Sequence, residues 1–226
     1  MNLLTVTNLS AGYAGKQVIK DISFFVAPKT IVGILGANGC GKTTLIKAIA
    51  NLLPHTGSCQ LDDTYLENAS PRQLALLCGY IPQKSGISID LTLLDVVLMG
   101  FNPKLSLLQS PTEQMKKEAF DALCSVGLGS RKGDNFQQLS EGQKQLCLLA
   151  RTFVLKRRLL LLDEPTSQLD PIAAGEFFNT LKRINSELGT TVIITEHRLE
   201  NLFPMVDRVV FMRSGSIVSN CSPADA

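Results

Sequence analysis

The sequence predicts an α/β fold in which helices cover a mostly parallel sheet. Four short apolar runs have the length of strands, and helix-like segments alternate with them along the chain. These runs are residues 31–35, 159–162, 191–195 and 209–212. Residues 159–162 are four leucines with no polar alternation, which is typical of a strand covered on both faces of a parallel sheet.

Signals at the segment ends support the helices between these strands. We expect helices over residues 42–50, 112–126, 140–154 and 173–188. Ser140 stands three residues before Gln143, which is the spacing of a capping box at a helix start. Asp170 and Pro171 precede the last helix and Gly189 follows it, and both are common signals of a helix boundary.

Two further regions differ from this pattern. Residues 2–35 are rich in Val, Ile, Thr and Phe and predict strands and turns. Residues 84–138 contain helix-like segments and loops, which predict a helical subdomain inserted into the core. We therefore expect one domain over 1–226, in which about 1–83 and 155–226 form the core with a β subdomain and about 84–154 form the helical subdomain.

Composition limits the classes of function. The chain has 22 Lys and Arg against 20 Asp and Glu, and this near balance argues against a basic face that binds nucleic acid. No apolar stretch approaches 18 residues and no secretory signal begins the chain, so we expect neither a membrane span nor export. The six cysteines form no CxxC pair. We expect reduced thiols, with Cys40 in a loop and those at 59, 78, 124, 147 and 221 in the core.

Residues 36–44, GANGCGKTT, match the phosphate-loop pattern between a predicted strand and a predicted helix. Backbone N–H groups of such a loop bind phosphates when glycines keep side chains away, and the helix dipole adds to the attraction. We expect Lys42 to contact the β and γ phosphates and the Thr43 hydroxyl to bind Mg²⁺. The predicted nucleotide-binding residues of the loop are Gly36, Ala37, Asn38, Gly39, Cys40, Gly41, Lys42, Thr43 and Thr44.

The leucine strand ends in two carboxylates, Asp163 and Glu164, about 120 residues after the phosphate loop. Ligands bind beyond the carboxyl ends of strands in open α/β sheets. Asp163 is placed to bind Mg²⁺, directly or through water, and Glu164 to orient or deprotonate an attacking water. An Asp-Glu-Pro sequence alone would also suit a solvated turn, but with the phosphate loop it predicts phosphoryl transfer.

The sequence LSEGQ, residues 139–143, lies between these motifs at a predicted helix start. Together with LLLLDEPTSQLD, it resembles the ATP-binding cassette (ABC) family, the motor subunits of ABC transporters, from Leu3 to about Val218. The resemblance implies a P-loop NTPase core of mostly parallel sheet, an N-terminal antiparallel β subdomain and an inserted helical subdomain. It also implies transport-coupled ATP hydrolysis with ATP and Mg²⁺.

The resemblance assigns roles to further residues. Tyr13 matches the aromatic residue that stacks on adenine, and His197 matches the switch histidine that hydrogen-bonds the γ-phosphate. The implied catalytic residues are Glu164, His197, Gln83 and Lys42, and the implied metal ligands are Thr43, Gln83 and Asp163. The implied contacts with the nucleotide of a facing subunit involve Ser140, Glu141, Gly142, Gln143 and Asp170, and Asp170 also matches the loop that communicates across the dimer. Glu141 stands where the family usually has glycine, and it adds a carboxylate near that nucleotide.

The resemblance implies an obligatory pair of cassettes. A phosphate loop in one subunit faces the signature sequence of a second ABC subunit, identical or different, and two ATP molecules lie between them. We expect a separate transmembrane permease to dock near Gln83 and the helical subdomain, and no nucleic acid partner. The expected location is the cytoplasmic face of a bacterial or archaeal cell membrane, as a peripheral subunit.

Two segments resemble different importers. Residues 90–111 resemble motors that import iron–siderophore complexes, haem or cobalamin, and residues 195–218 resemble energy-coupling-factor motors for vitamins or metal ions. We favour a metal chelate or a cobalamin-like compound as cargo. A degenerate module that binds ATP beside an active partner is a further alternative. The chain stops at Ala226, soon after the last predicted strand, and we expect no additional regulatory domain in it.

Overall fold

The computed structural model describes residues 2–83, 86–87, 89–106, 108–197 and 202–225. Its strands are β1 (Leu4–Tyr13), β2 (Lys16–Val26), β3 (Ile31–Leu35), β4 (His55–Leu61), β5 (Thr64–Tyr65), β6 (Cys78–Ile81), β7 (Leu159–Asp163), β8 (Thr191–Glu196), β9 (Arg208–Arg213) and β10 (Ser216–Cys221). Its α-helices are α1 (Lys42–Ile49), α2 (Pro71–Leu77), α3 (Leu93–Leu98), α4 (Glu113–Ser125), α5 (Glu141–Phe153) and α6 (Pro171–Leu188). All four strands and all four helices predicted from the sequence are among them.

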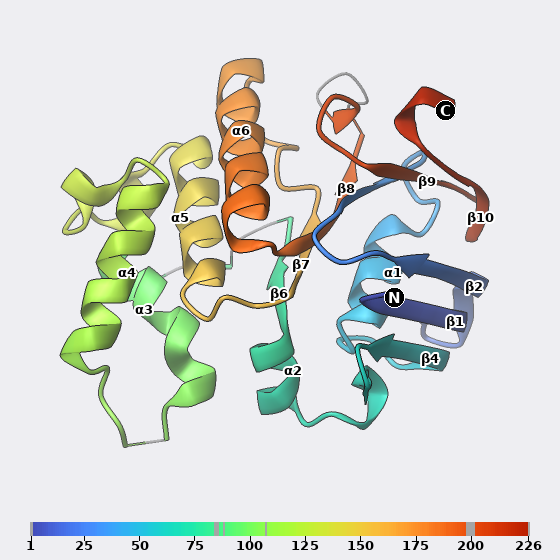
Figure 1. Ribbon diagram of the computed structural model, residues 1–226, viewed down its shortest axis with the longest axis horizontal. Coiled ribbons are helices and arrows are strands. Elements are labelled where there is room, and N and C mark those ends of the chain that lie inside the picture. The colour runs from blue at the N-terminus through green and yellow to red at the C-terminus, as the bar shows by residue number, and fades with distance from the viewer. Residues whose placement is uncertain (1, 84–85, 88, 107, 198–201, 226) are drawn as a thin grey trace.

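These strands form two sheets (Figure 1). The larger has the order β10-β9-β3-β8-β7-β6, and all its pairs are parallel except β9 with β10. The smaller has the order β2-β1-β4-β5 and is antiparallel. This arrangement confirms the predicted α/β class, with a mostly parallel sheet and an antiparallel β part. Strands β4, β5, β6 and β10 and helices α2 and α3 were not predicted as separate elements.

Both faces of the parallel sheet are covered, as the apolar run of β7 predicts. Leu160 and Leu162 belong to a core cluster that includes side chains of α3 to α6, whereas Leu159 and Leu161 belong to a cluster with α1 and the antiparallel sheet. All four side chains are at most 1% exposed. Figure 1 shows the helices α3 to α6 on one side of this sheet and the antiparallel sheet on the other.

The predicted helix caps are present. The Ser140 hydroxyl accepts a hydrogen bond from the Gln143 N–H at 3.3 Å, and the Gln143 side chain accepts one from the Ser140 N–H at 3.2 Å. The Asp170 carboxylate caps α6, and Gly189 ends it in the left-handed conformation at φ 64°. Helices α3, α4 and α5 pack on one another. The boundaries of the helical subdomain at about 84 and 154 stay a prediction.

The expectation for the cysteines is partly wrong. Cys59, Cys78 and Cys147 are buried as predicted, but Cys124 is exposed and Cys221 is half-buried. The buried residues of helix α4 are Ala119 and Leu123, and Cys124 lies on its solvent side. Cys221 is the last residue of β10, a strand at the edge of its sheet. Within the described residues, none of the helices combines the length and apolarity that crossing a membrane requires.

Candidate active site

The phosphate loop connects β3 to α1, as predicted. Gly41 is the N-cap of α1 at φ 108°, a conformation that favours glycine, and a Cβ there would lie 2.7 Å from the Ile19 side chain. The Lys42 ammonium donates to the carbonyl oxygens of Gly36 at 2.8 Å and Ala37 at 3.4 Å. Lys42 is only 4% exposed, so its cation is held inside the loop where a phosphate would bind.

Side-chain oxygen atoms of three residues meet beside this loop, at the end of β7. The Thr43 hydroxyl donates to Asp163 Oδ1 at 2.8 Å, and the Thr195 hydroxyl donates to the same atom at 3.1 Å. Mg²⁺ prefers oxygen ligands, usually one or two carboxylates with water and substrate phosphates completing its shell. The hydroxyl and the carboxylate fit this ion, which accords with the predicted role of both side chains.

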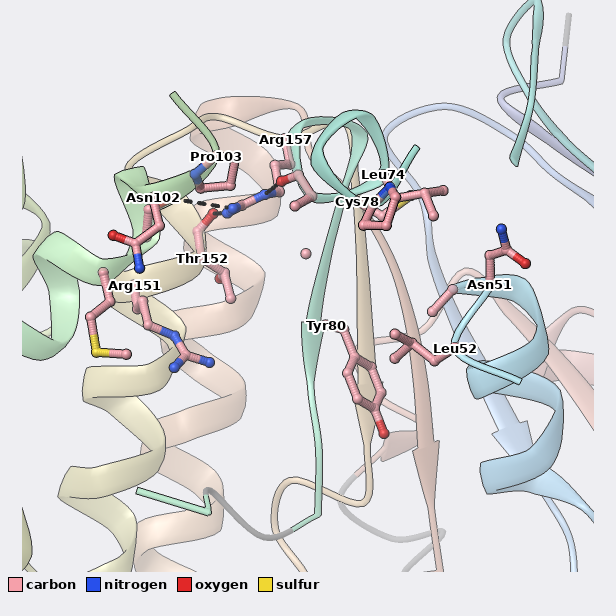
Figure 2. A pocket seen from close by; sticks show the side chains of 16 residues that line it. Asn51, Leu52, Leu74, Cys78, Tyr80, Asn102, Pro103, Arg151, Thr152 and Arg157 are labelled. Carbon is pink, nitrogen blue, oxygen red and sulfur yellow. Dashed lines mark hydrogen bonds between the residues drawn. The ribbon is translucent and has the colours of Figure 1, made fainter. Parts of the chain in front are cut away.

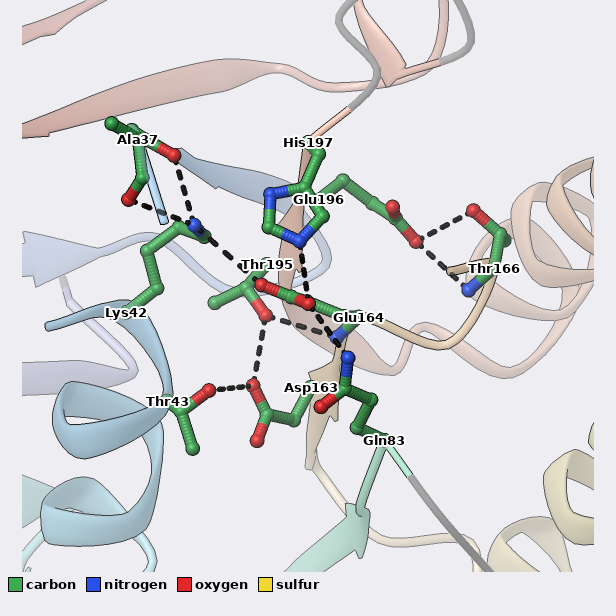
Figure 3. Close-up of polar contacts among 11 residues, drawn as sticks. Ala37, Lys42, Thr43, Gln83, Asp163, Glu164, Thr166, Thr195, Glu196 and His197 are labelled. Atoms are coloured by element: carbon green, nitrogen blue, oxygen red, sulfur yellow. Dashed lines mark hydrogen bonds and ion pairs between the residues drawn. The ribbon is translucent and has the colours of Figure 1, made fainter. Parts of the chain in front are cut away.

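The other predicted catalytic residues converge on Glu164 (Figure 3). Gln83 donates its amide N–H to Glu164 Oε2 at 3.0 Å, and His197 Nε2 lies 2.6 Å from the same oxygen. Lys42 Nζ lies 3.5 Å from Glu164 Oε1. Glu164 itself has a positive φ of 49°, which costs a non-glycine residue roughly 1–2 kcal/mol. The fold therefore holds this carboxylate in a strained and specific position.

A cavity of about 350 Å³ opens between these side chains. It is lined by Val18, Asn38, Gly39, Gly41, Lys42, Thr43, Thr44, Gln83, Glu164 and His197. Nine of the ten are residues predicted from the sequence, and they come from four separate parts of the chain. A cavity lined by a buried lysine and a glycine-rich loop at a helix start suits a polyphosphate.

Tyr13 and the signature residues do not line this cavity. Tyr13 is 45% exposed at the end of β1. Ser140 and Asp170 cap the first turns of α5 and α6, and these turns touch, because a Cβ on Gly142 would lie 2.9 Å from the Cβ of Ala173. Their predicted roles, which involve adenine and a nucleotide of the facing subunit, stay predictions.

Glu141, the unusual signature residue, has a partner within its own helix. Its carboxylate forms an ion pair with Lys144 at 2.7 Å, three residues along α5. The Glu141 side chain is 48% exposed, so this pair contributes little to stability. The pair offsets part of the negative charge of the Glu141 carboxylate.

Sequence reasoning missed three polar residues of the site. Thr195 and Glu196 end β8, and the rule that ligands bind at the carboxyl ends of parallel strands would have found them. The Tyr80 hydroxyl lies 3.4 Å from Asp163 Oδ2, and no motif marks it. Burial raises the pKa of Tyr80. Burial also raises the pKa of the Glu196 carboxyl, and the hydrogen bonds from Thr166 oppose part of this second shift.

Comparisons with known proteins agree with this geometry. The family model described as "ABC transporter" matches residues 19–167. A putative ABC transporter ATP-binding protein of Bacillus cereus is 38% identical over 96% of this chain. The alignment covers 40% of that relative, so the chain spans less than half the length of the first relatives it matches.

Two shorter relatives match over most of their own length. The hemin import ATP-binding protein HmuV of Bordetella parapertussis is 33% identical, covering 98% of this chain and 87% of that protein. The solved structure of cbiO1 from Clostridium perfringens, part of the ABC transporter complex cbiONQ, superposes with a TM-score of 0.87 at 26% identity, covering 99% and 90% of the two chains. The chain therefore belongs to the ABC transporter family, as one of its ATP-binding cassettes.

Proposed function

We propose that this chain is the ATP-binding and ATP-hydrolysing motor subunit of an ABC importer. The convergence of Lys42, Gln83 and His197 on the Glu164 carboxylate, next to the Thr43–Asp163 pair, is the observation that carries the proposal. An attacking water needs an oriented carboxylate, and the phosphates need a cation and a metal site. All of these residues except Asp163 line one cavity, and Asp163 accepts a hydrogen bond from Thr43 in its lining.

In the proposed reaction, water attacks the γ-phosphorus and Glu164 accepts its proton. The bond from the γ-phosphorus to the β,γ-bridging oxygen breaks, and ADP leaves with that oxygen. Lys42 exchanges its present contacts with the Gly36 carbonyl and Glu164 for the β and γ phosphates. His197 and Gln83 keep the Glu164 carboxylate aimed at the water. Mg²⁺, held by Thr43, Asp163 and Gln83, would neutralise charge on the phosphates.

Two such cassettes are proposed to close around ATP. Ser140 and Gly142 lie outside the cavity described above, so one chain does not supply them to its own nucleotide. In the proposed dimer they face the γ-phosphate held by the second subunit. Binding of ATP then closes the pair, and charge repulsion after hydrolysis reopens it.

A second cavity, of about 450 Å³, is the proposed docking site of the permease (Figure 2). It lies between Leu52, Leu74 and Tyr80 on one side and Asn102, Pro103 and Arg151 on the other. Its described lining residues include two arginines and no carboxylate. The Tyr80 ring lines it while the Tyr80 hydroxyl reaches Asp163, which connects the docking cavity to the metal site.

For the cargo, we propose a metal chelate or a cobalamin-like compound. The name of the Bordetella relative supports import of this kind. The likeness of residues 195–218 to energy-coupling-factor motors keeps that type as the alternative. In either case the chain would work as a peripheral subunit at the cytoplasmic face of the membrane.

Light scattering of the purified chain tests this proposal, with Glu164→Gln to slow hydrolysis and Lys42→Ala as the control that weakens phosphate binding. We expect the Glu164→Gln variant to change from monomer to dimer when Mg-ATP is added, and the doubly substituted variant to stay monomeric. ATP binding without dimer formation would indicate a different partner chain or a need for the permease. Absence of ATP binding would contradict the proposed function.

A further inference from the structure

One buried carboxyl near the site has no role in the proposed reaction. Glu196, the last residue of β8, is 1% exposed, and Figure 3 shows its carboxylate turned away from Lys42 toward Thr166. It accepts hydrogen bonds from the Thr166 N–H at 3.0 Å and from the Thr166 hydroxyl at 2.8 Å. Thr166 is also 1% exposed, so water does not compete for this contact.

This contact holds a turn that connects two residues with roles in the proposed function. The turn starts at Glu164 and leads to Asp170, the residue assigned to communication between subunits. Its own backbone hydrogen bonds are few: Ser167 N–H donates to the Glu164 carbonyl at 3.2 Å, and Leu169 N–H donates to the Thr166 carbonyl at 3.0 Å. The strained φ of Glu164 therefore needs support from neighbouring elements.

The end of β8 and the residue after it supply that support. Thr195 accepts the Glu164 N–H with its hydroxyl at 3.0 Å and with its carbonyl at 3.1 Å. Glu196 holds Thr166, two residues after Glu164. His197 contacts the Glu164 carboxylate itself. The segment that carries the switch histidine thus holds the turn at two points, Glu164 and Thr166.

We propose that Glu196 is a positioning residue that, through Thr166, fixes the direction of the Glu164 carboxylate and couples His197 to the turn leading to Asp170. The inference rests on the proposed function, because it requires Glu164 to act on the attacking water. Burying a carboxyl is unfavourable, so packing alone would favour an apolar side chain at this place. The two hydrogen bonds from Thr166 are what the carboxylate contributes.

Three substitutions separate positioning from a purely structural contribution. Glu196→Ala removes the acceptor, Glu196→Gln keeps a carbonyl oxygen for the Thr166 donors, and Thr166→Val removes the hydroxyl from the other side. ATP turnover of the full chain is measured against ATP concentration, and Glu164→Gln is measured in the same preparation. ATP affinity and thermal unfolding are measured on the same samples.

We expect Glu196→Ala to lower kcat about 10- to 100-fold, because small misplacement of a reacting group has effects of this size. KM and ATP affinity should stay within about threefold, because the phosphate loop is untouched. Glu196→Gln should restore kcat to within about threefold of the parent. Thr166→Val should lower kcat on its own and add little to Glu196→Ala, since both substitutions weaken the same contact between Glu196 and Thr166.

Three results would overturn the inference. An unchanged kcat in Glu196→Ala, while Glu164→Gln is inactive, leaves the proposed function standing and removes the role of Glu196. If Glu196→Ala lowers kcat, ATP affinity and the unfolding temperature together, Glu196 is a structural residue only. If Glu196→Ala does not fold, an unchanged kcat in Thr166→Val removes the positioning role of Glu196. Full turnover in Glu164→Gln would instead contradict the proposed function itself.

Discussion

The Thr43 hydroxyl donates a 2.8 Å hydrogen bond to the Asp163 carboxylate across 120 residues of sequence. The order of the parallel sheet explains this contact. Strand β8 lies between β3 and β7, so the loop after β3 and the acidic end of β7 open at the same edge. The metal-binding oxygens of the proposed site therefore follow directly from strand order.

Replacing Thr43 by valine keeps the size of the side chain and removes that hydroxyl. We expect Thr43→Val to raise the Mg²⁺ concentration needed for half-maximal ATP turnover about tenfold or more. The substitution removes a proposed Mg²⁺ ligand and also the hydrogen bond that the hydroxyl donates to Asp163. A titration of ATP turnover with Mg²⁺ measures this. Thr64→Val, on the exposed strand β5, is the matched control and should leave the titration unchanged.

His197 contacts Glu164 more closely than any other predicted catalytic residue does, at 2.6 Å. We expect His197→Ala to lower kcat about 100-fold or more, because the carboxylate loses a partner that orients it for proton transfer. ATP affinity should change little, since Lys42 and the loop are intact. Steady-state kinetics with a separate ATP-binding assay distinguish the two effects. A large loss of ATP affinity with normal kcat would assign His197 to binding.

The sequence predicted the elements that carry strong local patterns. The unbroken leucines of β7, the capping box at Ser140 and Gln143, and the glycine loop before Lys42 each have one local interpretation, and the structure agrees with all three. Strand β6 and the two-residue β5 are too short to show a periodicity. The end of β8 was predicted, but the direction of the Glu196 side chain depends on Thr166, 30 residues away.

Arg157 gives a prediction about stability. It is 9% exposed and donates to the carbonyl oxygens of Ala75 at 2.7 Å, Thr152 at 2.9 Å and Gly100 at 3.4 Å, and burial lowers its pKa to about 10. Removing it leaves three carbonyls, two of them in buried residues, with one partner fewer. We expect Arg157→Met to lower the free energy of unfolding by about 2–4 kcal/mol.

Urea unfolding measures this change, and the neighbouring Arg158 provides the control. The Arg158 side chain is 62% exposed and pairs with Asp62 at the surface, where an ion pair contributes about 0–1 kcal/mol. Arg158→Met should therefore leave the unfolding midpoint almost unchanged. Equal midpoints for the two variants would show that the carbonyl contacts of Arg157 do not stabilise the fold.

Four of the cysteine thiols divide into two classes by their expected rate of alkylation. Burial raises the pKa of Cys59, Cys78 and Cys147 to about 12, so these thiols stay protonated and enclosed in the folded chain at pH 8. Cys124 is exposed and reacts as an accessible thiol. We expect a maleimide at pH 8 to label Cys124 rapidly and Cys59, Cys78 and Cys147 only after unfolding in urea, with Cys124→Ser as the control that removes the rapid labelling at this position.

The same three thiols predict a loss of stability in alkali. In the unfolded chain they ionise near pH 9, whereas in the folded chain they hold their protons to about pH 12. The unfolded state then binds fewer protons, so the free energy of unfolding falls as pH rises between these values and is unaffected by these groups below pH 9. Urea unfolding at pH 8 and pH 10 measures the difference. Cys147→Ala should reduce the slope, because it removes one of the three buried thiols whose pKa is raised.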